Sequence, residues 1–191
     1  HCGVAEIEGH ESYNREQAEY APLIVKKLFE NPLSYGIVTD GDGDRGMLLK
    51  YDREADCVKV YDGDEESFLV LSLMKAEGKV PADSCVVHTL ESDIMASVSF
   101  AKKFGCRAVI TDVGDKWICN CPEKNIVIGF ESSGHVIIPL EAAGKPYLSG
   151  NGLLTAAMAA LALKEGHKSF VRGFSKTWYT YFVDKALFAL D

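Results

Sequence analysis

The segment that most constrains the fold is Tyr35 to Gly46, which reads Y-G-I-V-T-D-G-D-G-D-R-G. Its short run of apolar and β-branched residues, Ile37 to Thr39, predicts a buried strand. The run ends directly in three aspartates at alternate positions, with glycines between them. The fold of this chain must therefore contain a buried strand that is followed directly by a loop with three negative charges.

Asp40, Asp42 and Asp44 carry the charge of this loop. Carboxylates ~5 Å apart repel one another by roughly 3 kcal/mol per pair at an effective dielectric constant of about 20, so a bound cation is the natural way to keep all three ionised. Hard oxygen ligands suit Mg²⁺ or Ca²⁺ rather than zinc. A site with few protein ligands and room for phosphate and water favours Mg²⁺. The loop therefore predicts a magnesium site.

Three other kinds of loop share part of this pattern. An EF-hand needs glycine at its sixth position and glutamate at its twelfth, where this chain has Arg45 and Tyr51, so that interpretation fails. A phosphatase of the haloacid-dehalogenase type also places D-x-D after an apolar strand, but it usually continues with Gly and then Thr or Val. An Asp-Gly turn without a ligand does not need three spaced acids followed by arginine. The last two interpretations stay open as alternatives.

Composition limits the class of protein. The chain has 191 residues, 47% hydrophobic and 25% charged, which predicts a globular protein of one domain or one and a half. Its net charge of -8, without a basic stripe, argues against a nucleic-acid partner, and no segment is expected to span a membrane. Cysteines within apolar runs, such as Cys85, are typical of reduced thiols and favour a cytoplasmic location. Because the chain begins at His1 rather than methionine, we expect a processed or truncated chain.

Helices and strands are expected to alternate along the chain, which predicts an α/β fold with helices layered on a mixed sheet. The helix from 153 to 163 is apolar nearly all round, so we expect it to be central and buried. Residues 113–117 are expected to form a turn, and Asp64 is the expected cap of the second helix. The expected strands are 37–39, 47–51, 57–61, 85–89, 108–111, 125–128 and 136–138, and the expected helices are 22–31, 64–78, 93–104 and 153–163.

A second motif, Gly129 to His135, lies between two predicted strands and reads G-F-E-S-S-G-H. It follows the aspartate loop by about ninety residues, with V-G-D-K at 113–116 between them and G-N-G-L-L-T-A at 150–156 after them. In order and spacing these motifs resemble those of the α-D-phosphohexomutase family, which includes phosphoglucomutases and phosphomannomutases. The resemblance covers roughly residues 22–166.

The resemblance implies a role for each motif residue. Asp40, Asp42 and Asp44 would bind Mg²⁺. Arg45 would contact the phosphate or phosphoserine, and Lys116 matches the active-site lysine, so these two are the expected catalytic residues. This agrees with general chemistry, because phosphoryl transfer needs positioning and charge neutralisation more than covalent chemistry.

In the second motif, Glu131 and Ser133 would contact the sugar hydroxyls, and His135 would support that loop or the substrate. The residue types suit this role, since a carboxylate accepts two hydroxyl hydrogen bonds and a serine hydroxyl donates or accepts. The expected partner is thus a phosphorylated hexose.

The family is built of four domains, and its phosphoserine motif, typically T-A-S-H-N-P, does not occur in this sequence. We therefore expect residues 1–46 to end domain 2, residues 47–166 to form the sugar-binding α/β domain 3, and residues 167–191 to lead towards domain 4. The parent enzyme would interconvert hexose 1-phosphate and hexose 6-phosphate through a phosphoserine and a bisphosphorylated sugar. This chain would need the remaining domains as partners and be inactive alone. A non-catalytic sugar-phosphate-binding module, or a metal-dependent phosphatase with Asp40 as nucleophile, are the alternatives.

Overall fold

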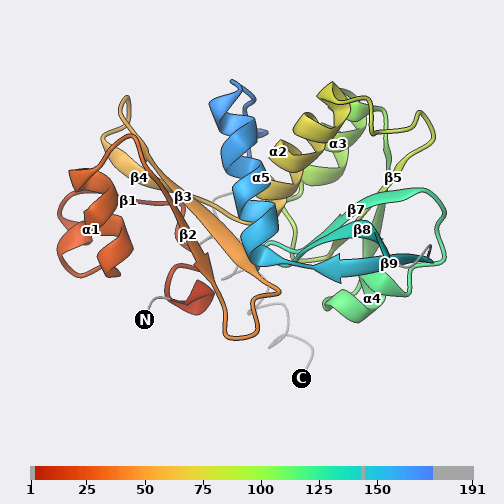
Figure 1. Cartoon of the computed structure of the whole chain (residues 1–191), viewed down its shortest axis with the longest axis horizontal. Coiled ribbons are helices and arrows are strands. Elements are labelled where there is room, and N and C mark those ends of the chain that lie inside the picture. Colours follow the sequence, from red (N-terminus) through yellow and green to blue (C-terminus); the bar gives the residue numbers. More distant parts are fainter. Residues whose placement is uncertain (1–2, 143–144, 174–191) are drawn as a thin grey trace.

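The computed structural model describes residues 3–142 and 145–173. Two β-sheets lie side by side with helices between and around them (Figure 1), which confirms the predicted α/β class. The elements are η1 (Val4–Glu6), β1 (Ser12–Tyr13), η2 (Gln17–Glu19), α1 (Leu23–Glu30), β2 (Tyr35–Thr39), β3 (Gly46–Asp52), β4 (Cys57–Tyr61), α2 (Gly63–Ala76), β5 (Cys85–Thr89), α3 (Ala96–Phe104), β6 (Arg107–Thr111), α4 (Asp115–Cys119), β7 (Ile126–Phe130), β8 (Val136–Ala142), β9 (Lys145–Gly150) and α5 (Gly152–Lys164).

The first sheet is antiparallel, with strand order β1-β4-β3-β2. Thr39 at the end of β2 pairs with Gly46 at the start of β3, so the aspartate loop is the connection of a β-hairpin. One face of this sheet packs on α1, whose buried residues Val25 and Leu28 lie on one side of the helix, as its apolar spacing predicts. The hairpin therefore carries the loop at the edge of a packed sheet.

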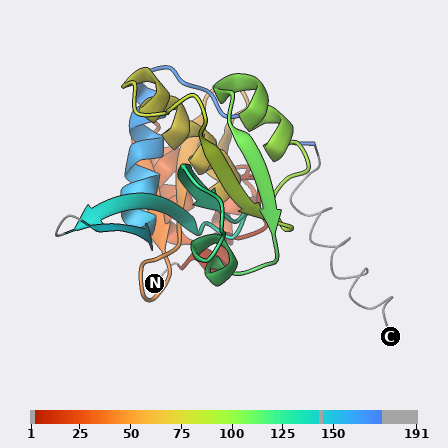
Figure 2. The same ribbon diagram turned by 90° about the vertical axis from the view of Figure 1, so that its right-hand side faces the viewer.

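The second sheet has strand order β6-β5-β7-β8-β9. β5 is parallel to β6 and β7, whereas β8 and β9 run antiparallel to their neighbours. Figure 2 shows β5 and β6 side by side. Every residue of β5 is buried because helices cover both faces of the sheet: α2 and α3 lie on one side and α4 on the other (Figure 1).

Helices α2 and α5 join the two sheets into one core. The largest cluster of buried apolar residues contains Leu48 of β3, Phe68 of α2, Val86 of β5 and Ala156 of α5. Small residues on α5, which recur every three positions at Ala156, Ala159 and Ala162, let its neighbours approach closely.

The helix α5 is central, as expected, since it packs against α2, β2 and β3, but the expectation that it is buried holds for one side only. Leu153, Leu154 and Leu161 are 60%, 39% and 43% exposed, because the alanine stripe faces the core and the leucines lie on the opposite side. None of the helices within residues 3–142 and 145–173 is long and apolar enough to cross a membrane.

Other local expectations also need correction. Asp62 rather than Asp64 caps α2, since its Oδ1 accepts a hydrogen bond from the Glu65 N–H at 3.1 Å. α3 starts at Ala96 instead of residue 93, because the Asp93 carboxylate accepts the N–H of Met95 and forms a turn before the helix. The expected turn at 113–117 is partly the short helix α4, and strands β1 and β9 were not predicted.

Candidate functional site

The two predicted motifs meet in the structure although they belong to different sheets. The β2–β3 loop and the β7–β8 turn touch through their backbones, where Gly46 N donates to Gly134 O at 3.0 Å. Arg45 and His135 form an isolated antiparallel bridge beside that bond. The aspartate loop and the Glu131 turn therefore form one site built on two sheets.

Glycines make this close approach possible. Gly46, Gly63, Gly134 and Gly152, which we call the glycine seam, bring the β2–β3 loop, the β7–β8 turn and the first residues of α2 and α5 together. A Cβ atom on any of them would overlap backbone atoms of another segment. Gly134 also has φ of 93°, which L-residues rarely adopt. The seam thus fixes the two motifs relative to each other by main-chain contact.

The carboxylate of Asp40 holds the β2–β3 loop in shape. Its Oδ1 accepts the backbone N–H groups of Gly43 at 3.1 Å and Arg45 at 3.2 Å. Its Oδ2 accepts a charge-assisted hydrogen bond from Arg45 Nε at 2.8 Å. An ionised carboxylate offers about four lone-pair directions, so the loop uses three and leaves one for a cation.

The three aspartates converge. One carboxylate oxygen from each of Asp40, Asp42 and Asp44 lies within 4.8 Å of the others. Burial acts to raise the pKa of Asp40, but the hydrogen bonds and charge of Arg45 outweigh it and hold that pKa below its ordinary value. Burial raises the pKa of Asp44, and repulsion from the other two aspartates adds to it, against the opposing effect of His135. A hard divalent cation would relieve this repulsion, so the donor set fits Mg²⁺.

His135 lies between the two loops. Its Nε2 is 3.8 Å from Asp44 Oδ2 and its Nδ1 is 3.9 Å from Glu131 Oε2, and its side chain is 10% exposed. These separations exceed hydrogen-bond length, so neither contact is a hydrogen bond in this structure. The backbone of Gly150 packs against the ring so closely that a Cβ atom there would overlap it. The ring is thus enclosed between a predicted metal ligand and a predicted sugar ligand.

The turn that contains Lys116 is connected to the sugar loop through Glu131. Glu131 is almost buried, and its Oε1 accepts a hydrogen bond from Gly114 N at 2.7 Å. Lys116 itself is exposed on α4, with its ammonium 5.3 Å from the centre of the Trp117 ring. Ser133 is half-buried, and its hydroxyl has no hydrogen-bond partner within the described part of the chain. Both residues can reach a ligand without breaking a side-chain bond of this structure.

Two glutamates at this site were missed by the sequence analysis. Glu8 Oε2 lies 4.0 Å from Arg45 Nη1. Burial raises the pKa of Glu8, and it also raises the pKa of Glu91, where Glu131 and Glu8 add repulsion. No sequence signal marks them, because Glu8 lies in a polar segment without periodicity and Glu91 in the connection between β5 and α3.

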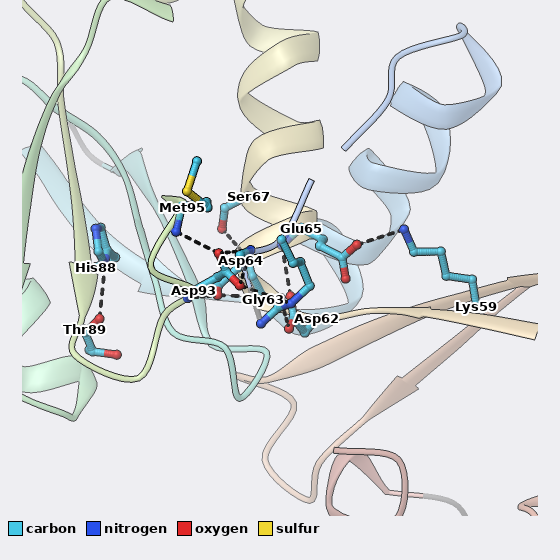
Figure 3. Close-up of polar contacts among 12 residues, drawn as sticks. Lys59, Asp62, Gly63, Asp64, Glu65, Ser67, His88, Thr89, Asp93 and Met95 are labelled. Carbon is cyan, nitrogen blue, oxygen red and sulfur yellow. Dashed lines mark hydrogen bonds and ion pairs between the residues drawn. The ribbon is translucent and has the colours of Figure 1, made fainter. Parts of the chain in front are cut away.

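A separate cluster of charged residues surrounds the start of α2 (Figure 3). Arg172 Nη1 pairs with Asp62 Oδ2 at 2.7 Å, and its Nε lies 3.6 Å from Asp93 Oδ2. Asp64 Oδ2 accepts the Asp93 N–H at 2.7 Å. Burial and the charge of Asp62 raise the pKa of Asp64 to about 8. The network attaches the segment around Arg172 to the helix that also carries Gly63 of the glycine seam.

Comparison with protein families and curated proteins identifies related sequences. The family model described as phosphoglucomutase/phosphomannomutase, alpha/beta/alpha domain III, matches residues 62–181. The phosphoglucosamine mutase of Bacillus pumilus is 33% identical over 144 residues, which cover 73% of this chain and 29% of that protein. The phosphoglucosamine mutase of Caldicellulosiruptor bescii is 29% identical over 147 residues, which cover 76% and 30%. The chain thus spans about 30% of the length of the curated relatives that it matches.

Solved structures share the fold. A crystal structure of N-acetylglucosamine-phosphate mutase in its product complex, described as a member of the alpha-D-phosphohexomutase superfamily, superposes with a TM-score of 0.60 at 18% identity, covering 86% of this chain and 35% of that one. The Aspergillus fumigatus N-acetylphosphoglucosamine mutase in complex with GlcNAc-6P and magnesium gives a TM-score of 0.58 at 18% identity, covering 94% and 39%. At these identities the likeness shows the fold.

Proposed function

The chain belongs to the phosphoglucomutase/phosphomannomutase family, and we propose that it supplies the metal-binding and sugar-binding loops of a phosphohexomutase. The observation that carries the proposal is the direct contact of the two loops, through the 3.0 Å hydrogen bond from Gly46 N to Gly134 O. The reacting phosphoryl group and the sugar ring would then occupy neighbouring positions on one rigid support. The division of the chain at residues 46 and 166 stays part of this proposal, with β2 and β3 paired across the first boundary.

In the proposed site, Asp40, Asp42 and Asp44 would hold Mg²⁺. The ion would supply positive charge beside the transferred phosphoryl group. Arg45 would add a second positive charge. Asp40 accepts a side-chain hydrogen bond only from the Nε atom of Arg45, and the Nη1 atom of Arg45 lies 4.0 Å from Glu8, beyond hydrogen-bond length. Lys116, Glu131, Ser133 and His135 would face the sugar phosphate.

The substrate would be a phosphorylated hexose that binds in two orientations. The curated relatives with up to 33% identity are phosphoglucosamine mutases, which makes glucosamine 6-phosphate the first ligand to test. Glu8, Glu91 and Glu131 lie close enough to repel one another, and a sugar that carries an ammonium group would relieve this repulsion. Neutral hexose phosphates are the comparison ligands.

The metal site is tested by calorimetric titration of the chain with Mg²⁺. Asp42→Asn is expected to weaken binding at least tenfold, since it removes one anionic ligand from an exposed position while keeping the side-chain shape. Asp112→Asn, another exposed aspartate outside the loop, is the matched control and should bind as the parent chain does. Equal affinity in all three proteins would contradict the site.

The sugar site is tested by titrating the chain with glucosamine 6-phosphate and following amide signals by NMR. Glu131→Ala is expected to raise the dissociation constant by roughly 10- to 150-fold, because a hydrogen bond to a charged group is worth about 1.5–3 kcal/mol. A dissociation constant within twofold of the parent would remove Glu131 from the site. Glu123→Ala is the control, since that glutamate pairs with Arg107 on the surface.

The phosphatase alternative would use Asp40 as a nucleophile. Hydrogen bonds within the loop, including the 2.8 Å bond from Arg45, use three of the about four lone-pair directions of its carboxylate, so the one that remains cannot serve both a metal ion and the attack on phosphorus. This observation favours the mutase proposal. Release of phosphate from a generic phosphate ester by the purified chain, abolished in Asp40→Asn, would favour the phosphatase instead.

A further inference from the structure

The side chain of Glu131, in the β7–β8 turn, is held by a hydrogen bond from a residue outside that turn. Its Oε1 accepts the backbone N–H of Gly114, the residue before α4, at 2.7 Å. The Glu131 side chain is 8% exposed, so little water competes for this bond. A short hydrogen bond from an N–H group to an enclosed carboxylate is charge-assisted and fixes the plane of the carboxylate.

The other oxygen of Glu131, Oε2, accepts no hydrogen bond from the described residues and is the one left for a ligand. Oε2 lies 3.9 Å from His135 Nδ1, which is too long for a hydrogen bond. Rotating the carboxylate to present both oxygens would break the bond to Gly114. The bond therefore fixes the orientation of Oε2, and it uses one of the about four lone-pair directions of the carboxylate.

Gly114 is suited to this role by its conformation. Its φ of 116° and ψ of 138° lie where L-residues are strained. Space is not the reason for glycine, because a Cβ atom there would meet Trp117 at 3.9 Å and Lys116 at 4.0 Å, which is ordinary contact. A side chain at this position would favour another φ and turn the N–H group away from Glu131.

We propose that Gly114 is a positioning residue for sugar recognition: its N–H orients Glu131 so that Oε2 accepts a hydrogen bond from the phosphorylated hexose. The inference rests on the proposed function, since it concerns the carboxylate that would bind the sugar. Gly114 also precedes Lys116 by two residues, so its bond to Glu131 sets where the lysine turn lies relative to the sugar loop.

The bond is tested first without ligand, through hydrogen exchange of the Gly114 amide measured by NMR. In Glu131→Ala the acceptor is lost, and exchange should become at least tenfold faster. In Glu131→Gln the side-chain carbonyl still accepts the N–H, so exchange should stay within about threefold of the parent chain. Unchanged exchange in Glu131→Ala would overturn the inference.

The effect on recognition is measured with glucosamine 6-phosphate and the 191-residue chain. Gly114→Ala should raise the dissociation constant roughly tenfold, about the effect of losing one charge-assisted hydrogen bond. Gly105→Ala is the matched control, because Gly105 also has a positive φ, of 75°. A Cβ atom at Gly105 would have no atom within 4 Å, and this residue follows α3 and does not contact Glu131. It should bind within twofold of the parent. Amide spectra of each variant verify that it is folded.

A double-mutant cycle separates the route through Glu131 from an effect through Lys116. If Gly114 acts by orienting Glu131, Gly114→Ala should not weaken binding further in a Glu131→Ala background. A tenfold effect that persists in that background would overturn the inference. Unchanged affinity in Glu131→Ala alone would overturn the proposed role of Glu131 and this inference with it. Unchanged affinity in Gly114→Ala alone would overturn the inference and leave the role of Glu131 standing.

Discussion

At the scale of single residues, the buried carboxyl group of Asp64 is expected to make the free energy of unfolding depend on pH. Burial and the repulsion of Asp62 raise its pKa to about 8 from an ordinary 3.8, although Arg172 opposes the shift. The folded chain thus holds a proton on this group over a pH range in which the unfolded chain has released it. Because the folded state binds more protons there, the free energy of unfolding falls as pH rises.

Asp64→Asn should remove this dependence. Between about pH 4 and pH 8, the free energy of unfolding of the parent chain should fall with rising pH more steeply than that of the variant, by up to about 1.4 kcal/mol per pH unit. Above pH 8, the free energies of unfolding of the two proteins should change with pH at the same rate. Urea denaturation at a series of pH values measures both slopes. Asp112→Asn, which changes an exposed aspartate, should keep the parent slope. Parallel curves for Asp64→Asn and the parent would contradict the raised pKa.

Residues in local motifs could be predicted from the sequence, whereas residues that act through tertiary contacts could not. The spacing of Asp40, Asp42 and Asp44 indicates converging carboxylates, and the structure brings their oxygens within 4.8 Å. By contrast, Glu8 approaches Arg45 because the neighbouring residues Val4 and Ile7 pack in the core of the first sheet. The bond from Gly114 to Glu131 likewise depends on two turns of the second sheet lying side by side.

At the scale of elements, the glycine seam makes a prediction about stability. A Cβ atom at Gly152 would overlap the backbone carbonyl of Arg45, which cannot move without displacing the aspartate loop. Gly152→Ala should therefore lower the free energy of unfolding by about 1–3 kcal/mol or more, as overpacking does elsewhere.

Urea denaturation of Gly152→Ala measures this cost, with Gly41→Ala as the matched control. Gly41 has no atom within 4 Å of a Cβ position and lies in the same loop, so its substitution should change stability by less than about 0.5 kcal/mol. Similar stability of the two variants would show that the loop and α5 are not in tight contact.

Elements with strong periodicity were predictable, and short elements were not. α1 spans Leu23–Glu30, close to the expected 22–31, because its apolar residues repeat at helical spacing. β9 was missed because its order comes from pairing with β8 rather than from its own pattern. α4 was expected as a turn because five residues carry too little periodicity to distinguish the two.

At the scale of the whole molecule, the proposal predicts that the chain has no mutase activity alone. The purified 191-residue chain should not convert glucosamine 6-phosphate to glucosamine 1-phosphate, because the serine motif that the resemblance implies for phosphoryl transfer does not occur in its sequence. A coupled assay measures this, and an added full-length phosphoglucosamine mutase verifies the detection. Turnover that scales with the chain and is lost in Asp42→Asn would refute the proposal that other domains are needed.

Main-chain contact across the glycine seam has a consequence for ligand design. Side chains can change rotamer to suit different sugars, but the spacing between the aspartate loop and the Glu131 turn is set by backbone atoms with no room to adjust. The seam therefore fixes the distance between the two halves of the site. A bidentate inhibitor that joins a phosphonate to a sugar mimic should need one linker length, and a linker one methylene longer or shorter should lose most of its affinity instead of being accommodated.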